Sequence, residues 1–190
     1  MLPHNSIAMI KFLIEGLRDI QTVGTIASTS SSTGRRMLRQ IDFKTASCIV
    51  EMGAGDGVIT KEILAKLAPS SKLLAFEVNT RFCLELAKIN DPRLVVIEDS
   101  AEKIQEYLLK YGFEKADHVI SALPFSSLPL ALGESIVTKA RDALKKGGLY
   151  VQIHYSLHRK SLYQRIFGNV DWEITALNLP PAFLLTSIKE

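Results

Sequence analysis

The sequence predicts an α/β domain in which a mostly parallel sheet is covered by helices on both faces. From Ala46 onward, short β-rich apolar runs alternate with amphipathic helical patterns, which is typical of strand–helix–strand units. The chain of 190 residues is also long enough to bury a core of its own. Its content of 47% apolar and 23% charged residues is that of a folded globular protein.

Seven strands and their connecting helices are expected along this body. Each expected strand is a short β-rich run, and each expected helix shows amphipathic periodicity. Lys146-Gly147-Gly148 has the features of a helix stop, because cations lie in the last turn and glycine follows. The last two strands are expected to form an antiparallel hairpin-like element joined around Pro180 and Pro181. The expected strands are 47–52, 72–78, 94–98, 118–123, 149–154, 172–178 and 183–188, and the expected helices are 58–67, 81–89, 101–111, 130–146 and 158–167.

Residues 1–45 precede this body and are expected to form a helical segment. Helices are expected at 7–20 and 34–41, joined by a hydroxyl-rich run at 28–33 that favours a solvated linker ending in a helix N-cap. In the first helix the charged residues fall within about 100° of arc, and apolar residues fill most of the remainder. An arc this wide predicts contact with a membrane interface or a partner, or else a lid over the site that packs on the sheet edge.

The composition excludes several classes of protein. A net charge of +3 is less than a dedicated nucleic-acid binder carries, although it does not oppose an anionic partner. The two cysteines cannot form a disulfide framework or a multi-cysteine metal site, and the four histidines lie in different elements, so no metal is expected. The sequence has no run of roughly 18 uncharged apolar residues and no signal-peptide pattern. We therefore expect a cytoplasmic protein.

A glycine-rich turn follows the first expected strand, in the segment Glu51-Met52-Gly53-Ala54-Gly55-Asp56-Gly57. Ligands of an open parallel sheet bind beyond the carboxyl ends of its strands, and glycines there let the backbone approach a ligand closely. The following helix points its N-terminal N–H groups at the same place. The dinucleotide fingerprint G-x-G-x-x-G fails, because Val58 stands at its third glycine position. Here three glycines follow one another at intervals of two residues, and an acid on the strand precedes them. This is instead the pattern with which proteins bind S-adenosylmethionine.

Two further strand ends carry acids. Glu77 lies at the end of the second expected strand, 20 residues after Gly57. A carboxylate there can accept both hydroxyls of a ribose, and a solvated strand-end acid is the alternative. Asp99 and Ser100 follow the third strand. Asp99 suits the amino group of an adenine, and either residue suits the N-cap of the next helix.

Residues 51–57, Glu77, Asp99 and the fourth strand end, Ser121-Ala122-Leu123-Pro124-Phe125, together resemble the class I S-adenosylmethionine-dependent methyltransferases over residues 46–190. The resemblance implies a Rossmann-like, mostly parallel seven-stranded sheet with an N-terminal helical appendage. It also implies S-adenosylmethionine as cofactor, released as S-adenosylhomocysteine. The cofactor-binding residues it implies are Glu51, Gly53, Ala54, Gly55, Gly57, Glu77, Val78, Asp99, Ser100 and Ser121, and the acceptor-side residues are Ser121, Ala122, Leu123, Pro124, Phe125 and Tyr155.

Two groups of these enzymes match the fourth strand end. Leu123-Pro124-Phe125 resembles the Asn-Leu-Pro-Tyr segment of the ribosomal RNA adenine dimethyltransferases, in which the asparagine holds the exocyclic amine and the ring stacks on the base. Ala122 stands at the asparagine position, and the helical C-terminal domain with which those enzymes contact RNA is not expected here. The bacterial phospholipid N-methyltransferases are the better match. Their segment resembles Ser-Gly-Leu-Pro, and their N-terminal segment is similar to residues 22–28.

The sequence therefore predicts an N-methyltransferase for the amine headgroup of a phosphatidylethanolamine-type phospholipid, acting as a peripheral protein at the inner face of the membrane. Methylation of RNA at adenine N6 is the alternative, and a cofactor-binding subunit without chemistry of its own is a third interpretation.

An amine must be neutral to attack, so a group near the acceptor has to accept its proton. Candidates are the backbone carbonyls of Ser121 and Ala122, and the side chains of His154 and Tyr155, although His154 also suits a structural role. Phe125 is expected either to wall the acceptor pocket or to cap the core. Candidates to hold the lipid phosphate, unless they are merely a solvated helix start, are Arg35, Arg36, Arg39, Arg159 and Lys160.

Overall fold

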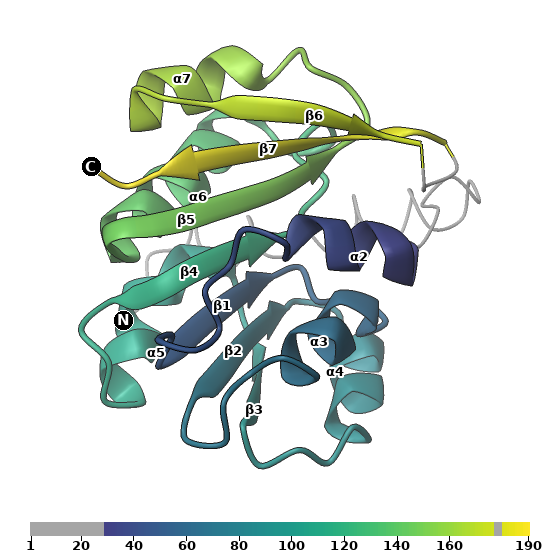
Figure 1. The fold of residues 1–190 in the computed structure, drawn as a ribbon, viewed down its shortest axis with the longest axis vertical. Helices are drawn as coiled ribbons and strands as arrows, with labels where there is room; N and C mark the ends of the chain where they lie inside the picture. The colour runs from purple at the N-terminus through teal and green to yellow at the C-terminus, as the bar shows by residue number, and fades with distance from the viewer. Residues whose placement is uncertain (1–28, 177–179) are drawn as a thin grey trace.

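The computed structural model describes residues 29–176 and 180–190, and its frame is one sheet of seven strands (Figure 1). The strands are β1 (Cys48–Met52), β2 (Lys72–Glu77), β3 (Leu94–Glu98), β4 (Ala116–Ser121), β5 (Leu144–His154), β6 (Asp171–Thr175) and β7 (Ala182–Ile188). The helices are α2 (Ser31–Met37), α3 (Val58–Leu64), α4 (Thr80–Ala87), α5 (Ile104–Lys110), α6 (Leu130–Ala143) and α7 (Lys160–Phe167), with a 3-10 turn η1 (Ala101–Lys103) before α5. No helix among these residues is long and apolar enough to cross a membrane.

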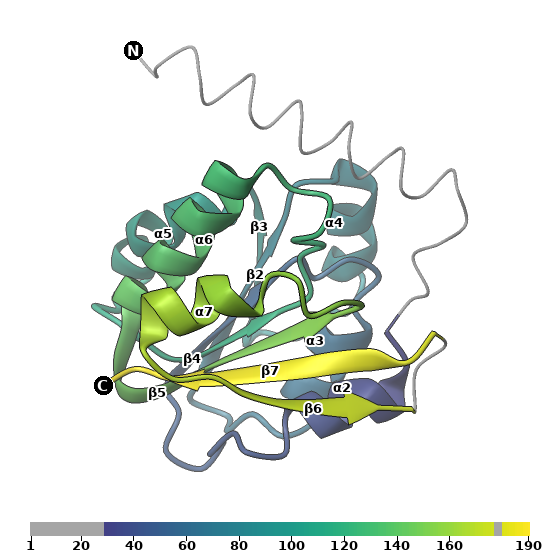
Figure 2. The ribbon, with the colours of Figure 1, turned by 90° about the horizontal axis from the view of Figure 1, so that it is seen from above.

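The strand order is β3-β2-β1-β4-β5-β7-β6. Strands β1 to β5 run parallel, and β7 is inserted antiparallel between β5 and β6. Figure 2 shows α5, α6 and α7 on one face of the sheet and α2, α3 and α4 on the other. The predicted α/β class, the seven mostly parallel strands and the antiparallel closing pair are confirmed. The expected helix at 7–20 lies outside the described residues.

Strand β1 lies at the centre of the sheet and is buried along its whole length. Its side chains alternate between the faces: Cys48, Val50 and Met52 join the core beneath α5, α6 and α7, and Ile49 joins the core beneath α2 and α3. Burying an aliphatic side chain of this size contributes about 1.5–3 kcal/mol. Glu51 is the one charged residue of this strand, and its position next to the glycine turn gives it a different role.

Helix α2 begins earlier than the predicted helix at 34–41. Ser30 is its N-cap, and the Ser30 side chain accepts a hydrogen bond from the backbone N–H of Thr33 at 3.1 Å. Thr33 and Gly34 are buried, and a Cβ on Gly34 would lie 3.6 Å from the Glu62 side chain of α3. The end of the hydroxyl run is therefore packed helix rather than solvated linker, because the cap comes three residues before the run ends.

The predicted helix stop at Lys146-Gly147-Gly148 is wrong. Helix α6 ends at Ala143, and the two glycines lie in the first part of β5. The N–H of Gly147 donates to the carbonyl of Lys189 at 2.7 Å, and the N–H of Lys189 donates to the carbonyl of Gly148 at 2.9 Å. The pairing of β5 with β4 shifts register at this point, between Ala116 and His118. The glycines serve a strand irregularity that depends on the C-terminal residues, which lie far away in the sequence.

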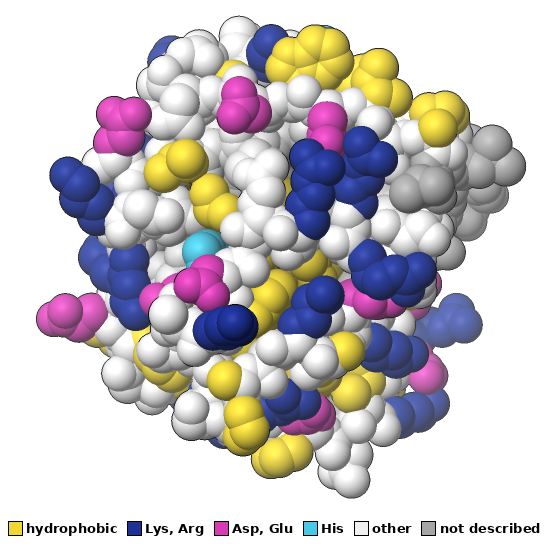
Figure 3. All heavy atoms as spheres, viewed as in Figure 1, with side chains coloured by type: hydrophobic (Ala, Val, Ile, Leu, Met, Phe, Trp, Pro, Cys, Tyr) yellow, Lys and Arg dark blue, Asp and Glu magenta, His cyan; other side chains and the backbone are white. Residues whose placement is uncertain are grey.

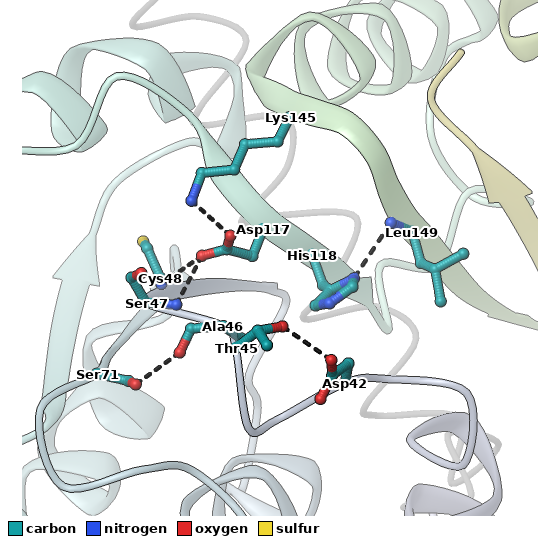
Figure 4. Close-up of polar contacts among 10 residues, drawn as sticks. All are labelled: Asp42, Thr45, Ala46, Ser47, Cys48, Ser71, Asp117, His118, Lys145 and Leu149. Carbon is teal, nitrogen blue, oxygen red and sulfur yellow. Dashed lines mark hydrogen bonds and ion pairs between the residues drawn. The ribbon is translucent and has the colours of Figure 1, made fainter.

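Polar contacts close the edge of the sheet at which the parallel strands begin (Figure 4). The Asp117 carboxylate accepts hydrogen bonds from the N–H groups of Ser47 and Cys48 at 2.7 and 2.8 Å, and from Nζ of Lys145. Burial opposes the charge of Asp117, but these hydrogen bonds outweigh it and lower the pKa of the carboxyl group. His118 Nδ1 accepts the N–H of Leu149 in β5 at 3.2 Å. The polar groups at this edge are therefore paired with one another, and the candidate functional residues lie at the opposite edge of the sheet.

Candidate active site

The candidate site lies where the order of the strands reverses, between the carboxyl ends of β1 and β4. Strands β1, β2 and β3 follow one another in one direction across the sheet, and β4 and β5 follow in the other. Helices that leave such a switch point on opposite faces open a crevice between them, and ligands bind in it. The glycine turn and Glu77 lie on one side of this crevice, and the loop that follows Ser121 lies on the other.

The glycine turn is shaped by three residues with positive φ: Gly53 (75°), Gly55 (53°) and Gly57 (80°). The N–H groups of Gly53 and Ala54 donate to the carbonyl of Phe76, at 2.9 and 3.2 Å, which fixes the turn against the end of β2. A Cβ on Gly53 would lie 2.9 Å from the Leu123 side chain, whereas a Cβ on Gly55 would have nothing within 4 Å. Gly53 therefore lets the loop after β4 come close, and Gly55 borders space that no other atom of the described residues fills.

Glu77 is tied to the glycine turn. The residue is only 6% exposed. Its Oε2 accepts the N–H of Gly55 at 2.9 Å, and Oε1 accepts the N–H groups of Val78 and Asn79 at 2.8 and 2.9 Å. Burial raises the pKa of Glu77 and outweighs these hydrogen bonds, which lower it. The alternative of a solvated strand-end acid is wrong. The contact with Gly55 was not predicted, since it joins residues from two strand ends.

Glu51 is fully buried and incompletely paired. Its Oε2 accepts the hydroxyl of Thr60 at 2.7 Å, while Oε1 has no hydrogen-bond partner among the described residues. Burial raises the pKa of Glu51 to about 8; the Thr60 hydrogen bond opposes this, and the nearby charges of Glu77 and Asp56 add to it. A buried carboxyl group with a spare oxygen, close to two other acids, fits a ligand that carries positive charge.

Of the two roles that were open to Asp99 and Ser100, the structure assigns the N-cap to Ser100. Ser100 is the N-cap of η1 and accepts the N–H of Glu102 at 3.3 Å. Asp99 instead accepts Nζ of Lys103 at 2.7 Å and the hydroxyl of Tyr107 at 3.0 Å. Burial opposes the charge of Asp99, but the contacts with Lys103, Ser100 and Tyr107 lower its pKa overall. Lys103 and Tyr107 belong to an ordinary helical pattern, so the sequence did not mark them.

The loop after β4 begins earlier than predicted, because the strand ends at Ser121 rather than at residue 123. The N–H of Ala122 donates to the carbonyl of Met52 at 2.9 Å, so the loop starts against the end of β1. Phe125 is only 1% exposed, and its ring packs against Tyr163 with centroids 6.2 Å apart. Phe125 therefore belongs to the core, and the expectation that it walls the acceptor pocket is wrong for this arrangement.

A buried polar network supports the loop from below. Gln152 Nε2 donates to the carbonyl of Leu123 at 3.1 Å, and Gln152 Oε1 accepts the hydroxyl of Tyr150 at 3.1 Å. Nearby, His154 Nε2 is hydrogen-bonded to the hydroxyl of Tyr163 at 2.8 Å. All four side chains are buried. Gln152, Tyr150 and Tyr163 were not predicted, since they occur in patterns that read as ordinary strand and helix.

Burial, together with the nearby charges of His158 and Arg159, lowers the pKa of His154 to about 4. We therefore expect the free energy of unfolding to fall as the pH drops from about 6.5 to about 4, because the unfolded chain binds a proton there that the folded chain does not. The contribution is on the order of 3 kcal/mol and is fully present above the higher value. Denaturation by urea at pH about 7.5 and about 5 should show a weaker pH dependence for His154→Gln; equal dependence would contradict the assignment.

The basic residues expected to hold a phosphate do not all lie beside the loop after β4. Arg35 pairs with Glu62 at 2.9 Å, and Arg36 and Arg39 both pair with Glu173. Arg159 contacts the loop between β4 and α6, residues 122–129, which we call the acceptor loop. Its guanidinium donates to the carbonyl of Leu128 at 3.2 Å, and its Nε is buried without a partner among the described residues. Lys160 Nζ lies 5.1 Å from the centre of the Trp172 ring.

Tyr155, at the end of β5, is 43% exposed. Within residues 29–176 and 180–190, no group of three or more His, Cys, Asp or Glu side chains is placed to hold a metal ion.

The strand order and the glycine turn at its switch point place this chain among the class I S-adenosylmethionine-dependent methyltransferases. It is an enzyme, and S-adenosylmethionine is its cofactor. Within that class, the chain belongs to the methyltransferase small domain family, whose model matches residues 27–176.

Relatives in sequence include a lipid-modifying enzyme. The chain is 29% identical over 173 residues to an ornithine lipid N-methyltransferase from Singulisphaera acidiphila, which covers 88% of this chain and 90% of that protein. It is 34% identical over 87 residues to ribosomal RNA small subunit methyltransferase H from Christiangramia forsetii, but this match spans only 28% of that protein.

Solved structures share the fold at low identity. Precorrin-6y C5,15-methyltransferase from Geobacter metallireducens superposes with a TM-score of 0.68 at 17% identity, covering 87% of this chain and 92% of that one. The O-methyltransferase of tomaymycin synthesis from Streptomyces achromogenes, in complex with S-adenosylmethionine, has a TM-score of 0.67 at 14% identity, with 94% and 90% covered.

Proposed function

We propose that this methyltransferase transfers a methyl group to the amine of a lipid headgroup, of the phosphatidylethanolamine or ornithine lipid type. The observation that carries this proposal is the 29% identity to an ornithine lipid N-methyltransferase, which extends over nearly the whole of both chains. The acceptor loop agrees with it, because Ala122 leaves its first position without a side-chain acceptor for a base. We assign residues 46–190 to the catalytic domain and residues 1–45 to contact with the membrane or to a lid.

The cofactor is proposed to lie along the carboxyl ends of β1, β2 and β3. Glu77, held by Gly55, would accept the ribose hydroxyls, and Gly53, Ala54, Gly55 and Gly57 would let the backbone approach closely. The unpaired Oε1 of Glu51 would meet the positive end of the ligand. On the adenine side and in the neighbouring backbone, the proposed contacts are Val78, Asp99, Ser100 and Ser121.

The acceptor is proposed to enter between the loop after β4 and the end of β5. When bound, the cofactor would supply a methyl group on a sulfonium. The amine nitrogen would bond to the methyl carbon in line as the carbon–sulfur bond breaks and the thioether of S-adenosylhomocysteine leaves, once the two are aligned and water is excluded. The backbone carbonyls of Ser121 and Ala122 would orient the amine N–H groups. The carbonyl of Leu123 already accepts a hydrogen bond from Gln152. This bond would fix the position of the loop as far as Pro124. Tyr155 would border the opening toward solvent, where the released proton leaves.

For an acceptor of the phosphatidylethanolamine type, the lipid phosphate is proposed to contact Arg159. This guanidinium is fixed by the acceptor-loop carbonyl of Leu128, and its buried Nε retains an unused donor. Arginine suits phosphate because its donors form a planar fork. Arg35, Arg36 and Arg39 are less suited, since each already pairs with an acid.

Methylation of RNA at adenine is the second candidate. The segment Leu123-Pro124-Phe125 favours adenine, and the partial likeness to ribosomal RNA small subunit methyltransferase H favours RNA without indicating a base. The position of Phe125 speaks against it, because a ring that is 1% exposed has no face on which a base could stack.

One labelling experiment decides between these acceptors. Purified protein and methyl-labelled S-adenosylmethionine are incubated with vesicles of phosphatidylethanolamine, vesicles of ornithine lipid or unmodified RNA, and each mixture is extracted with organic solvent. Label is expected in the organic phase with at least one of the two lipids. Label in RNA, with none in either lipid, would overturn the lipid proposal.

A further inference from the structure

Strand β6 forms the outer edge of the sheet and exposes apolar side chains. Trp172 is 44% exposed and Ile174 is 55% exposed. They are two residues apart, so both project from the sheet face that carries α7. Phe183 of β7 lies beside them, paired with Ile174 and with its ring centre 6.0 Å from that of Trp172. Figure 3 shows hydrophobic side chains gathered along this edge of the molecule.

Cations border this apolar edge on both faces. Lys160 of α7 lies over the indole ring, 5.1 Å from its centre. On the other face, Arg36 and Arg39 of α2 bind the Glu173 carboxylate. These three cations outnumber the two acids of β6, Glu173 and Asp171. Figure 3 shows Lys and Arg side chains next to the apolar edge.

The edge is connected to the candidate acceptor site through the sheet. Ser121 pairs with Gln152, Gln152 with Leu185, and Leu185 with Trp172, so all four lie on one rung across β4, β5, β7 and β6. Three strand spacings separate Ser121 from Trp172, about 14 Å. His154 of β5 and Ile174 of β6 both pair with the same β7 residue, and the exposed Tyr155 follows His154. The carboxyl end of β6, which carries Ile174, therefore lies on the same edge of the sheet as the proposed acceptor opening.

We propose that Trp172, Ile174 and Lys160, here called the β6 surface, dock on an anionic lipid bilayer. Tryptophan and lysine are the side chains that settle at the boundary between headgroups and acyl chains, and an adjacent isoleucine adds apolar area to insert. The excess of cations matches the negative surface of such a membrane. The inference rests on the proposed lipid activity, for which it supplies the face that brings the acceptor opening to the substrate.

Trp172 is the only tryptophan of the chain and reports on its own position. Its emission is recorded while vesicles of phosphatidylcholine and phosphatidylglycerol are added to the full chain. A shift to shorter wavelength is expected, with quenching by brominated acyl chains and weaker binding at high salt. Sedimentation of the protein with vesicles while the emission stays unchanged would overturn the proposal, and so would the absence of any binding.

A matched pair of variants locates the contact. Ile174→Ser is expected to weaken vesicle binding about tenfold, since it removes one inserted aliphatic side chain. Ile188→Ser is the control, because Ile188 is 47% exposed at the opposite end of the adjacent strand β7. Equal weakening by both variants would place the contact elsewhere and overturn the β6 surface.

Methyl transfer to lipid dispersed in detergent does not require docking on a bilayer, so it separates this test from that of the proposed function. Ile174→Ser should methylate dispersed phosphatidylethanolamine or ornithine lipid as the unchanged protein does. Failure of the unchanged protein on dispersed lipid would contradict the proposed function while the fluorescence result stands. Normal methylation of dispersed lipid without any response from Trp172 would contradict the docking surface alone.

Discussion

Replacing Glu77 with alanine is expected to lower the affinity for S-adenosylmethionine by at least about 100-fold. The carboxylate is proposed to accept two ribose hydroxyls, and hydrogen bonds to a charged acceptor are the stronger kind. It also holds the N–H of Gly55 at 2.9 Å, so its loss loosens the glycine turn. Calorimetric titration with S-adenosylmethionine and with S-adenosylhomocysteine measures both affinities without requiring an acceptor.

Two further variants assign the loss to the ribose contact. Glu98→Ala is the matched control, since Glu98 shares a rung with Glu77 but lies exposed at the end of β3, where it accepts the hydroxyl of Thr80. It should bind the cofactor normally. Glu77→Gln retains an oxygen for the backbone N–H groups but lacks the charge, and should fall between the two. Unchanged affinity in Glu77→Ala, with a thermal transition like that of the unchanged protein, would remove Glu77 from the site.

The parallel part of the fold was predictable because its pattern is local. Strands that are covered on both faces read as continuous apolar runs, and five such runs separated by helical periods leave few alternatives to a doubly covered sheet. The insertion of β7 between β5 and β6 was not predictable from the two closing runs, since a simple hairpin would fit the same pattern. The misread glycines at 147 and 148 have the same cause, because their partner is Lys189.

The residues of the candidate site differ in the same way: some are marked by the local sequence, and others depend on packing between distant segments. The glycine turn and Glu77 were predictable because each combines an unusual residue type with a strand end. Thr60, Gln152 and Tyr163 could not be found that way, since their chemistry arises only when a helix or strand packs beside the site. Phe125 was misplaced for the complementary reason. An aromatic residue in a loop fits either a ligand or the core, and only packing against Tyr163 decides it.

The sharpest test of where the cofactor lies is the pair Gly55→Ala and Gly112→Ala. Both glycines have positive φ, 53° and 82°, and an added Cβ would meet nothing within 4 Å at either position. Each variant should lose only the strain of a left-handed residue, about 1–2 kcal/mol of unfolding free energy. Gly55 borders the proposed cofactor cradle, whereas Gly112 follows α5. We therefore expect similar destabilisation, measured by urea denaturation.

Cofactor affinity should separate the two variants by at least about tenfold, because a methyl group at Gly55 occupies space that the ligand needs, while one at Gly112 points into solvent away from the site. The comparison is informative because both changes are the same chemically and carry the same backbone strain. A loss of affinity in Gly55→Ala alone therefore cannot come from instability. Equal affinities in the two variants would mean that the open space beside Gly55 does not receive the cofactor, and the proposed path along β1 and β2 would be wrong even though the enzyme class stands.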